Sequence, residues 1–482
     1  MLEQFGYLNT AILAAYLGGM VLIGVVLAGR QKTTEDYFLA GRRMPWLAVG
    51  MSMFASLTSA TTYMGVPAFA YGQNIAMIFG VVMSLAVAPI LGRLFYPIYR
   101  KHRVTTSYEY ILIRYGHAAR MAVSALFVLS RLGWLGIVIY APAKAMSVAS
   151  GMPLGLAIGL MGLLAVTYTV LGGLSAVIWT DVAQFVVLFG GAVWLLITLV
   201  THVPGGPAEI VRVAAETGKL DVFDWTDLSK LTALSAMISW FFVFLNDYGT
   251  DQVTVQRLLA VRNDKGVTKA IIFNACNDLL INGMLIFIGI GIFAYFRAFP
   301  DRLDPTIEAD GILPFYVMHI LPPGASGLIV TAIFAAAMSS VDSGINSVST
   351  VIVNDWVTPL RKRAARDRDN IALARVLTVV IGSLATLAAV YAAQVGNIVE
   401  MWSKVMGLFA APILGIFLLG MLTKRAHFLG WLVGAGFAIA TVAVLQRSAA
   451  EQVAPFWHFP VSFGITAVIG YAASLIIPKT RR

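Results

Sequence analysis

The chain has 482 residues, of which 59% are hydrophobic and only 12% are charged, and its mean hydropathy is +0.81. Soluble domains carry about 25% charged residues, so a water-soluble fold could not bury this much apolar surface and we expect the chain to lie in a lipid bilayer. The formal net charge of +10 is attributed to cytoplasmic loops rather than to nucleic-acid binding. The single cysteine, Cys276, excludes an intramolecular disulfide and a multi-cysteine metal site.

Thirteen apolar runs are long enough to cross a membrane as helices, because a span needs about 20 residues. They fall at 8–29, 45–72, 75–99, 118–149, 153–171, 177–201, 231–258, 267–297, 326–354, 371–394, 396–423, 427–447 and 457–477. Only one charge, Glu3, precedes the first run, so this run is expected to be a retained span and not a cleaved signal peptide. The sequence therefore predicts an all-α integral membrane protein.

Basic residues concentrate in alternate connections between these spans. They gather in residues 30–43, 100–114, 257–269, 361–368, 424–425 and 479–482, whereas the connections 202–230 and 298–325 carry most of the acidic residues. Loops rich in Lys and Arg stay in the cytoplasm. Because the number of spans is odd, the N-terminus is predicted to lie outside and the C-terminus inside.

The second span carries hydroxyl groups and helix breakers in its interior. In MSMFASLTSATTYMGVPAFAYG, residues 51–72, Ser and Thr residues between positions 56 and 62 precede Gly65 and Pro67. Proline lacks the backbone donor that a helix needs, so a break is expected near Gly65 and Pro67. Broken helices with free carbonyl groups form cation sites near the midplane of secondary transporters, and close packing of small residues is the alternative.

Charged residues lie within three further spans. Arg131, in the fourth span, has no acidic neighbour in the sequence and is expected either to pair with a remote carboxylate or to bind an anionic solute. Asp181, near the start of the sixth span, is expected either to cap the helix or to bind a cation. The tract FLNDYGTDQVTVQRLL, residues 244–259, interrupts the seventh span and predicts a second broken helix that lines a cavity or contacts other helices.

Oxygen-bearing residues also gather in the ninth span, within FAAAMSSVDSGINS at residues 334–347. One face of this helix carries Ala336, Ser339, Ser340 and Ser343, and Asp342 lies beside them. Charges and hydroxyl clusters at membrane depth mark transport pathways. Neutral oxygen ligands suit a hard monovalent cation, so this face is predicted to bind sodium, and serine hydrogen bonds to the preceding helical turn are the alternative.

The two interrupted spans lie five spans apart, which predicts two repeats of five helices, spans 2–6 and 7–11. Because five is odd, the repeats have inverted topology, and the solute and the coupling ion meet at the midplane. The chain is then one transmembrane domain, composed of an extra N-terminal helix with its inner loop (1–44), the first repeat (45–201), the second repeat (231–423) and two C-terminal helices (427–482).

Six segments, in this order, resemble the sodium/solute symporter family: KTTEDYFLAGRRMP, ASLTSATTYMGVPAFAY, LGGLSAVIWTDVAQ, TDQVTVQRLLA, AAAMSSVDSGINS and LGIFLLGML. The resemblance covers nearly the whole chain. The family includes bacterial proline, galactose and sialic acid transporters and mammalian glucose, iodide and vitamin symporters. The resemblance implies a LeuT-type fold and sodium-coupled uptake by alternating access.

By position, the resemblance also implies ion sites. The main sodium site would consist of the carbonyl groups of Ala55, Thr58 and Ala336 and the hydroxyl groups of Ser339 and Ser340. Some members have a second sodium site, whose positions correspond to Asp181, Asp342 and Ser343. Asp342 replaces what is usually a hydroxyl residue, so it either strengthens a second cation site or holds a proton there.

The resemblance leaves the solute open. The inner-gate tyrosine of the galactose transporter aligns with Asp247, which precedes Tyr248, and the arginine that anchors the solute carboxylate in the sialic acid transporter aligns with Trp134. Arg131 lies one turn from Trp134 and can substitute for that arginine. The predicted solute contacts are Thr62, Arg131, Trp134, Asp247 and Tyr248.

The sequence therefore predicts a sodium-coupled symporter, without catalytic or cofactor-binding residues, that imports a small polar solute, an organic acid or a sugar, across the plasma membrane (the inner membrane of a bacterium). Its expected partners are sodium, the solute and the lipid bilayer, with no nucleic acid and no obligate protein partner. A proton-coupled symporter on the same fold is the main alternative, because Asp181 and Asp342 can carry protons. Scattered histidines argue against a membrane enzyme, and two unlike broken repeats argue against a channel.

Overall fold

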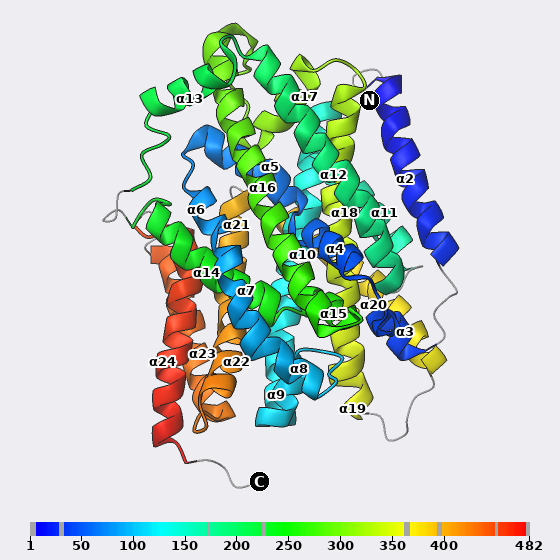
Figure 1. Ribbon diagram of the computed structural model, residues 1–482, viewed down its shortest axis with the longest axis vertical. Helices are drawn as coiled ribbons and strands as arrows, with labels where there is room; N and C mark the ends of the chain where they lie inside the picture. The colour runs from blue at the N-terminus through cyan, green and yellow to red at the C-terminus, as the bar shows by residue number, and fades with distance from the viewer. Residues whose placement is uncertain are drawn as a thin grey trace.

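The computed structural model describes residues 6–27, 33–170, 174–223, 228–360, 367–392, 398–448 and 452–478. Within these ranges the regular structure is helical, apart from one isolated parallel bridge between Met44 and Val261. Many of the helices run along the long axis of the molecule (Figure 1). The all-α prediction is thereby confirmed for the described part of the chain.

The helices have the following bounds. The first half of the chain contains α2 (Tyr7–Leu27), α3 (Thr34–Leu39), α4 (Trp46–Leu57), α5 (Ala60–Gly72), α6 (Met77–Val81), α7 (Met83–Ile90), α8 (Tyr96–Lys101), α9 (Tyr108–Tyr115), α10 (His117–Ser150), α11 (Leu154–Thr169), α12 (Leu174–His202) and α13 (Gly206–Glu216). The second half contains α14 (Ala233–Gly249), α15 (Gln252–Ala260), α16 (Asp264–Ala298), α17 (Ile312–Ile320), α18 (Ala325–Val351), α19 (Thr358–Leu360), α20 (Asp367–Ala392), α21 (Ile398–Val405), α22 (Ala411–Leu422), α23 (Phe428–Ser448) and α24 (His458–Ile476). Short turns of other helix types are η1 (Ala40–Arg42), η2 (Leu91–Phe95), η3 (Pro300–Arg302), η4 (Ala309–Gly311), η5 (Ile352–Val357), η6 (Met406–Ala410) and η7 (Pro455–Trp457).

Nine helices in the described part of the chain are long and apolar enough to cross a membrane. They cover residues 77–101, 117–148, 174–202, 264–298, 325–360, 367–392, 400–422, 428–448 and 455–476. The other four predicted spans coincide with α2, with α11 and with the pairs α4/α5 and α14/α15. The number of spans and the sides on which the two termini lie therefore remain predictions.

The second predicted span is broken, but not where its glycine and proline stand. Helix α4 ends at Leu57 and α5 begins at Ala60, and Thr58 and Ser59 between them have non-helical ψ angles of 79° and 176°. The Ser59 hydroxyl accepts a hydrogen bond from the Thr61 amide at 3.2 Å and so caps α5. The expected break at Gly65 and Pro67 is wrong, because both residues lie inside α5.

The seventh predicted span is broken where the sequence indicated. Helix α14 ends at Gly249 and α15 begins at Gln252. Asp251 caps α15, because its carboxylate accepts a hydrogen bond from the Val253 amide at 2.9 Å. The break places the capping carboxylate and the last turn of α14 inside the helix bundle.

Helix α18 lies in the interior of the bundle. Every residue from Ile329 to Val351 is buried, and the helix packs against α2, α4, α10 and α12. A helix buried on all sides has no face for lipid, so its polar residues meet other helices. The hydroxyl cluster of the ninth predicted span therefore faces protein.

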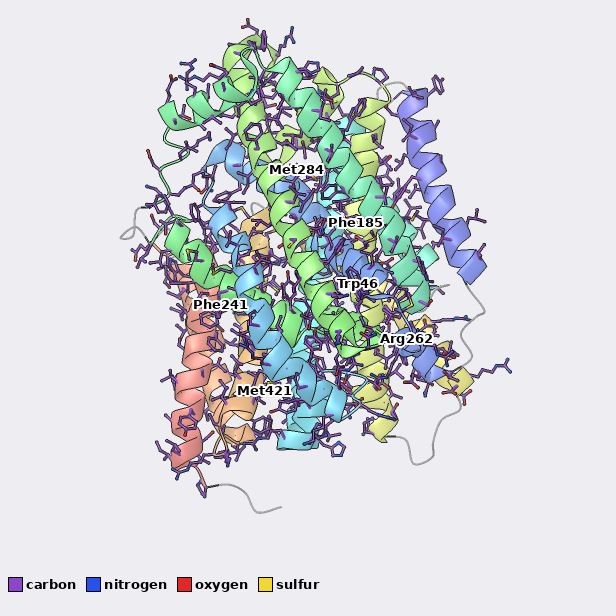
Figure 2. The ribbon with its side chains drawn as sticks, viewed as in Figure 1. Trp46, Phe185, Phe241, Arg262, Met284 and Met421 are labelled. Atoms are coloured by element: carbon purple, nitrogen blue, oxygen red, sulfur yellow. The ribbon has the colours of Figure 1, made fainter. Side chains whose placement is uncertain are left out.

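Aromatic side chains join α4, α12 and α16 beside this core. Figure 2 labels Trp46 of α4 and Phe185 of α12, which lie on neighbouring helices. The ring of Phe273 on α16 contacts both, with centroids 6.4 Å from Trp46 and 6.0 Å from Phe185. Such pairs contribute about 0.5–1.5 kcal/mol each, and they hold the first half of the broken span against its neighbours.

Candidate functional site

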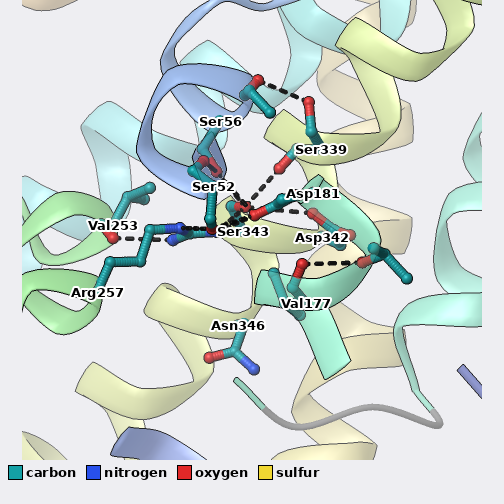
Figure 3. Close-up of polar contacts among 12 residues, drawn as sticks. Ser52, Ser56, Val177, Asp181, Val253, Arg257, Ser339, Asp342, Ser343 and Asn346 are labelled. Atoms are coloured by element: carbon teal, nitrogen blue, oxygen red, sulfur yellow. Dashed lines mark hydrogen bonds and ion pairs between the residues drawn. The ribbon is translucent and has the colours of Figure 1, made fainter. Parts of the chain in front are cut away.

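The end of α4 and the middle of α18 meet through oxygen atoms. The Ser339 hydroxyl donates a hydrogen bond to the Ala55 carbonyl at 2.7 Å and contacts the Ala336 carbonyl at 3.1 Å. The Ser340 hydroxyl donates to the Ser56 carbonyl at 2.9 Å. Figure 3 shows Ser339 reaching from α18 toward the α4 segment that carries Ser56.

Four of the five predicted sodium ligands belong to this junction, and Thr58 follows α4 directly. Within the described part of the chain, the Thr58 hydroxyl is buried and has no hydrogen-bond partner. The predicted ligands are carbonyl and hydroxyl oxygens without formal charge, which suit a hard monovalent cation. The unpartnered Thr58 hydroxyl adds one more neutral oxygen on the residue whose carbonyl is the predicted ligand. The residues present therefore fit sodium.

A second polar cluster lies one to two helical turns away, around Asp181 of α12. The Asp181 carboxylate accepts hydrogen bonds from the hydroxyls of Ser52 at 2.5 Å and Ser56 at 3.2 Å, both on α4. Ser343 of α18 contacts Ser56 at 2.9 Å and donates to Asp342 at 3.2 Å. The structure thus gathers the three residues predicted for a second cation site, Asp181, Asp342 and Ser343.

The structure adds Arg257 of α15 to this cluster. Arg257 was counted with the cytoplasmic loop charges, although it lies in the interrupted tract 244–259 of the seventh predicted span. Its guanidinium lies 3.0 Å from Asp181 and 2.8 Å from the Ser52 hydroxyl, and it donates to Ser343 (Figure 3). The side chain is only 1% exposed. The loop assignment is wrong, because α15 is the second half of a broken span and carries Arg257 into the bundle.

The predicted solute contacts line one cavity, which has a volume of about 110 Å³. Thr62, Arg131, Trp134, Asp247 and Tyr248 all contribute to its wall. The cavity also touches residues on either side of the α4/α5 break, Leu57 and Ser59 among them. The sequence therefore predicted which residues share the cavity, and their role in binding a solute remains a prediction.

Arg131 forms an ion pair across the cavity wall. Its Nε donates to the Asp251 carboxylate at 2.9 Å, and its Nη2 donates to the same oxygen. The guanidinium also lies over the Trp134 ring, 4.6 Å from the centroid. Of the two expected roles of Arg131, the structure shows the ion pair with a remote carboxylate, Asp251. The Arg131 side chain also lines the cavity.

Two polar residues of α16, Asp278 and Asn282, were missed as candidates although they line the same cavity. Asn282 donates to the Asp278 carboxylate at 3.0 Å, and Asn274 of the same helix donates to the Tyr248 hydroxyl at 2.8 Å. A carboxylate in the middle of an apolar run is itself a functional signal. This signal was present in the eighth predicted span and could have identified Asp278.

Among the described residues, no group of three or more His, Cys, Asp or Glu side chains could hold a metal ion. A transition-metal or zinc centre would need such a group. Alkali-cation binding does not, because it uses carbonyl and hydroxyl oxygens such as those between α4 and α18.

Known proteins similar to this chain transport solutes with sodium. The sodium/sialic acid symporter SiaT of Proteus mirabilis (strain HI4320) is 34% identical over 452 residues, covering 92% of this chain and 90% of SiaT. The human sodium/iodide cotransporter is 30% identical, covering 86% of this chain and 65% of the cotransporter. The solved structure of a substrate-bound, outward-open Na+-coupled sialic acid symporter is similar with a TM-score of 0.90 and 31% identity, covering 98% of this chain and 99% of that one.

The sequence model of the sodium:solute symporter family matches residues 37–436. A closed structure of Mhp1, a nucleobase-cation-symport-1 family transporter, has a TM-score of 0.56 at 13% identity and shares the fold alone. The resemblance found in the sequence is thereby confirmed, and the protein is a sodium-coupled membrane transporter and not an enzyme. The chain belongs to the sodium:solute symporter family.

Proposed function

We propose that this protein uses the sodium gradient to import a small polar solute, an organic acid or a sugar, across the plasma membrane, which in a bacterium is the inner membrane. The observation that carries the proposal is the junction of α4 and α18. There Ser339 bonds the Ala55 carbonyl at a helix break, and the residues after the break line the cavity. Ion and solute would share one broken helix.

In this proposal, sodium lies among the carbonyls of Ala55, Thr58 and Ala336 and the hydroxyls of Ser339 and Ser340. Binding from outside holds α4 and α5 against α18 and orders the cavity wall. Loss of the ion to the low-sodium cytoplasm releases this contact and the solute. One elementary charge that moves down a potential of 100 mV supplies about 2.3 kcal/mol for this cycle.

The relatives support an organic acid as the first solute class. Two similar proteins are sialic acid symporters, and others are sodium-coupled monocarboxylate transporters. Sialic acid is both an acid and a sugar derivative, so the relatives do not separate the two classes. Arg131, Trp134 and Thr62 would contact the solute together with Asp247 and Tyr248.

The two broken helix pairs support the inverted-repeat arrangement. The pair α4/α5 opens the proposed first repeat (45–201), and the pair α14/α15 opens the proposed second repeat (231–423). Helices α23 and α24 pack together after the second repeat (Figure 1). Thirteen spans, with the N-terminus outside and the C-terminus inside, complete the proposed topology.

The test is thermal unfolding of the purified protein in detergent, titrated with NaCl and with KCl of equal ionic strength. A ligand at 100 times its Kd stabilises by about 2.7 kcal/mol, so sodium should raise the unfolding temperature and potassium should not. Ser340→Ala should abolish the sodium response. Ser347→Ala is the matched control, because Ser347 is a buried serine of the same helix whose hydroxyl donates a hydrogen bond to the Gly344 carbonyl of its own helix.

The same titration distinguishes the proton-coupled alternative, which the cluster of Asp181 and Asp342 favours. In that case NaCl and KCl would act alike. Stability would instead depend on pH, and Asp342→Asn would remove that dependence. This result would contradict the sodium-site assignment.

A further inference from the structure

The charges on the cavity wall do not balance. Two carboxylates, Asp247 and Asp278, line the cavity together with one guanidinium, that of Arg131. Arg131 is already paired with a third carboxylate, Asp251, which lies outside the wall. The wall therefore carries more acidic than basic side chains, which is unexpected for a site that would take a simple anion.

The two wall carboxylates differ from Asp251 in forming no ion pair among the described residues. Within the described part of the chain, no ion pair involves Asp247 or Asp278. Asp278 is 9% exposed, and its second carboxylate oxygen is buried without a hydrogen-bond partner. A buried carboxylate is paired, binds a cation or takes up a proton. The cavity is the side from which a cation can reach both Asp278, which is buried, and Asp247, which is half-buried.

Aromatic rings complete a cation-binding wall. Trp134, Trp240, Trp402 and Phe244 also line the cavity. Trp240 and Trp402 lie with ring centroids 5.9 Å apart and planes inclined by 39°. Indole faces attract ammonium groups, including quaternary ones. Because Arg131 already lies over Trp134, the indole rings that favour the same charge as the two carboxylates are those of Trp240 and Trp402.

The cavity also keeps donors that suit a carboxylate. Arg131 lies on the wall, and the hydroxyl residues Thr61 and Thr62 line it as well. A solute with an acidic end toward these groups and an ammonium group toward Asp247 and Asp278 would satisfy both sets. A volume of about 110 Å³ suits a compact molecule.

We propose that the solute is a small zwitterion, an amino acid or an N-alkylated relative, whose ammonium group is held by Asp247 and Asp278 among the tryptophan rings. This inference rests on the proposed function and narrows its organic-acid class to acids that also carry a positive charge. It separates this chain from the relatives that transport sialic acid, iodide or monocarboxylates.

The test compares each zwitterion with a molecule of the same shape that lacks the positive charge. Glycine betaine is paired with 3,3-dimethylbutyrate, L-proline is paired with cyclopentanecarboxylate, and N-acetylneuraminate serves as the acid without an ammonium group. Each is titrated against the purified wild-type protein in NaCl, with thermal unfolding as the readout. At least one zwitterion should bind at least about tenfold more tightly than the carboxylate of the same shape that lacks the ammonium group, the effect of removing one charge partner in a desolvated site.

The variants test the two carboxylates separately. Asp278→Asn and Asp247→Asn should each weaken zwitterion binding by about tenfold or more. If one variant fails to fold, the other still tests the inference. Asp301→Asn is the control, because Asp301 is an exposed acid in η3 outside the cavity. It should leave zwitterion binding unchanged.

The outcomes separate this inference from the proposed function. Equal binding of a zwitterion and its carbon counterpart, preference for N-acetylneuraminate, or no binding by any zwitterion would overturn the inference while the sodium response persists. Loss of the sodium response itself, with Ser340→Ala behaving as wild type, would instead overturn the proposed function. Zwitterion binding that both Asp variants weaken would support the inference.

Discussion

The ion pair between Arg131 and Asp251 gives a quantitative test of how the cavity is built. The two side chains are 4% and 6% exposed, and Nε lies 2.9 Å from the carboxylate oxygen. Removing one member of a buried pair costs about 3–5 kcal/mol, because the other charge is left without a partner. Asp251→Asn and Arg131→Gln should each lower the free energy of unfolding by this amount.

The choice of asparagine isolates the charge. Asp251 also caps α15 through the Val253 amide, and asparagine caps a helix about as well as aspartate does. The double variant removes both charges and leaves no unpaired one. The double variant should therefore lose less free energy of unfolding than the two single variants lose together, by about 2 kcal/mol or more.

The assay is the free energy of unfolding, measured by titration with SDS in mixed micelles. The exposed pair of Arg212 and Glu209, with side chains 59% and 29% exposed, is the control cycle. Exposed pairs couple by less than about 1 kcal/mol, so its two single losses should add. If the losses at Arg131 and Asp251 also added, the pair would not be the buried contact that closes the cavity wall.

Three further predictions follow from other contacts. Arg257 supplies a positive charge to the second polar cluster in place of a second sodium ion, so the wild-type protein should bind sodium with a Hill coefficient near one. Arg257→Gln should raise this Hill coefficient. A Hill coefficient of two in the wild type would contradict the prediction. Gly289→Ala places a methyl group 2.3 Å from the Pro67 carbonyl oxygen and should lower the free energy of unfolding by about 1–3 kcal/mol, measured by thermal unfolding. Gly283→Ala on the same helix meets nothing closer than 3.8 Å and should leave stability unchanged. Equal losses of stability in the two variants would refute the contact. Burial lowers the pKa of Lys219 to about 8, so the folded protein binds the Lys219 proton less tightly than the unfolded chain does. The free energy of unfolding should therefore rise as pH increases from about 7 to about 9. This rise should be missing in Lys219→Met, and identical pH profiles of the two proteins would contradict the prediction.

Much of the site was predictable because polar and charged residues within membrane-spanning helices are a strong signal of function. A lipid-facing helix cannot carry hydroxyl clusters or carboxylates without cost, so the positions of Ser339, Asp181 and Asp247 pointed inward from the sequence alone. The interruption at residues 246–251 was also recognisable, because a capping aspartate follows a glycine there.

The position of the first break was not predictable by the same rule. Pro67 and Gly65 were expected to break the helix, but the capping hydroxyl of Ser59 does so earlier in the chain. Gly289 of α16 lies against the Pro67 backbone. The position of the break therefore reflects both local capping by Ser59 and packing between helices, and only the capping residue can be recognised in the sequence.

Arg257 shows a second limit. A basic residue near a span end looks like a loop charge when the span is treated as one helix, whereas the half-helix α15 carries Arg257 to Asp181. Partners far apart in the chain, such as Arg131 of α10 and Asp251 at the α14/α15 break, which are 120 residues apart, come together only in the folded bundle. Sequence patterns identify such charges but not their partners.

Equilibrium binding of radioactive sodium to the purified protein in detergent shows whether sodium binds where α4 breaks against α18. We expect saturable binding that excess NaCl displaces and KCl does not. This binding should be lost in Ser339→Ala and retained in Ser347→Ala. Sodium binding that survives Ser339→Ala unchanged, or that KCl displaces equally well, would contradict it.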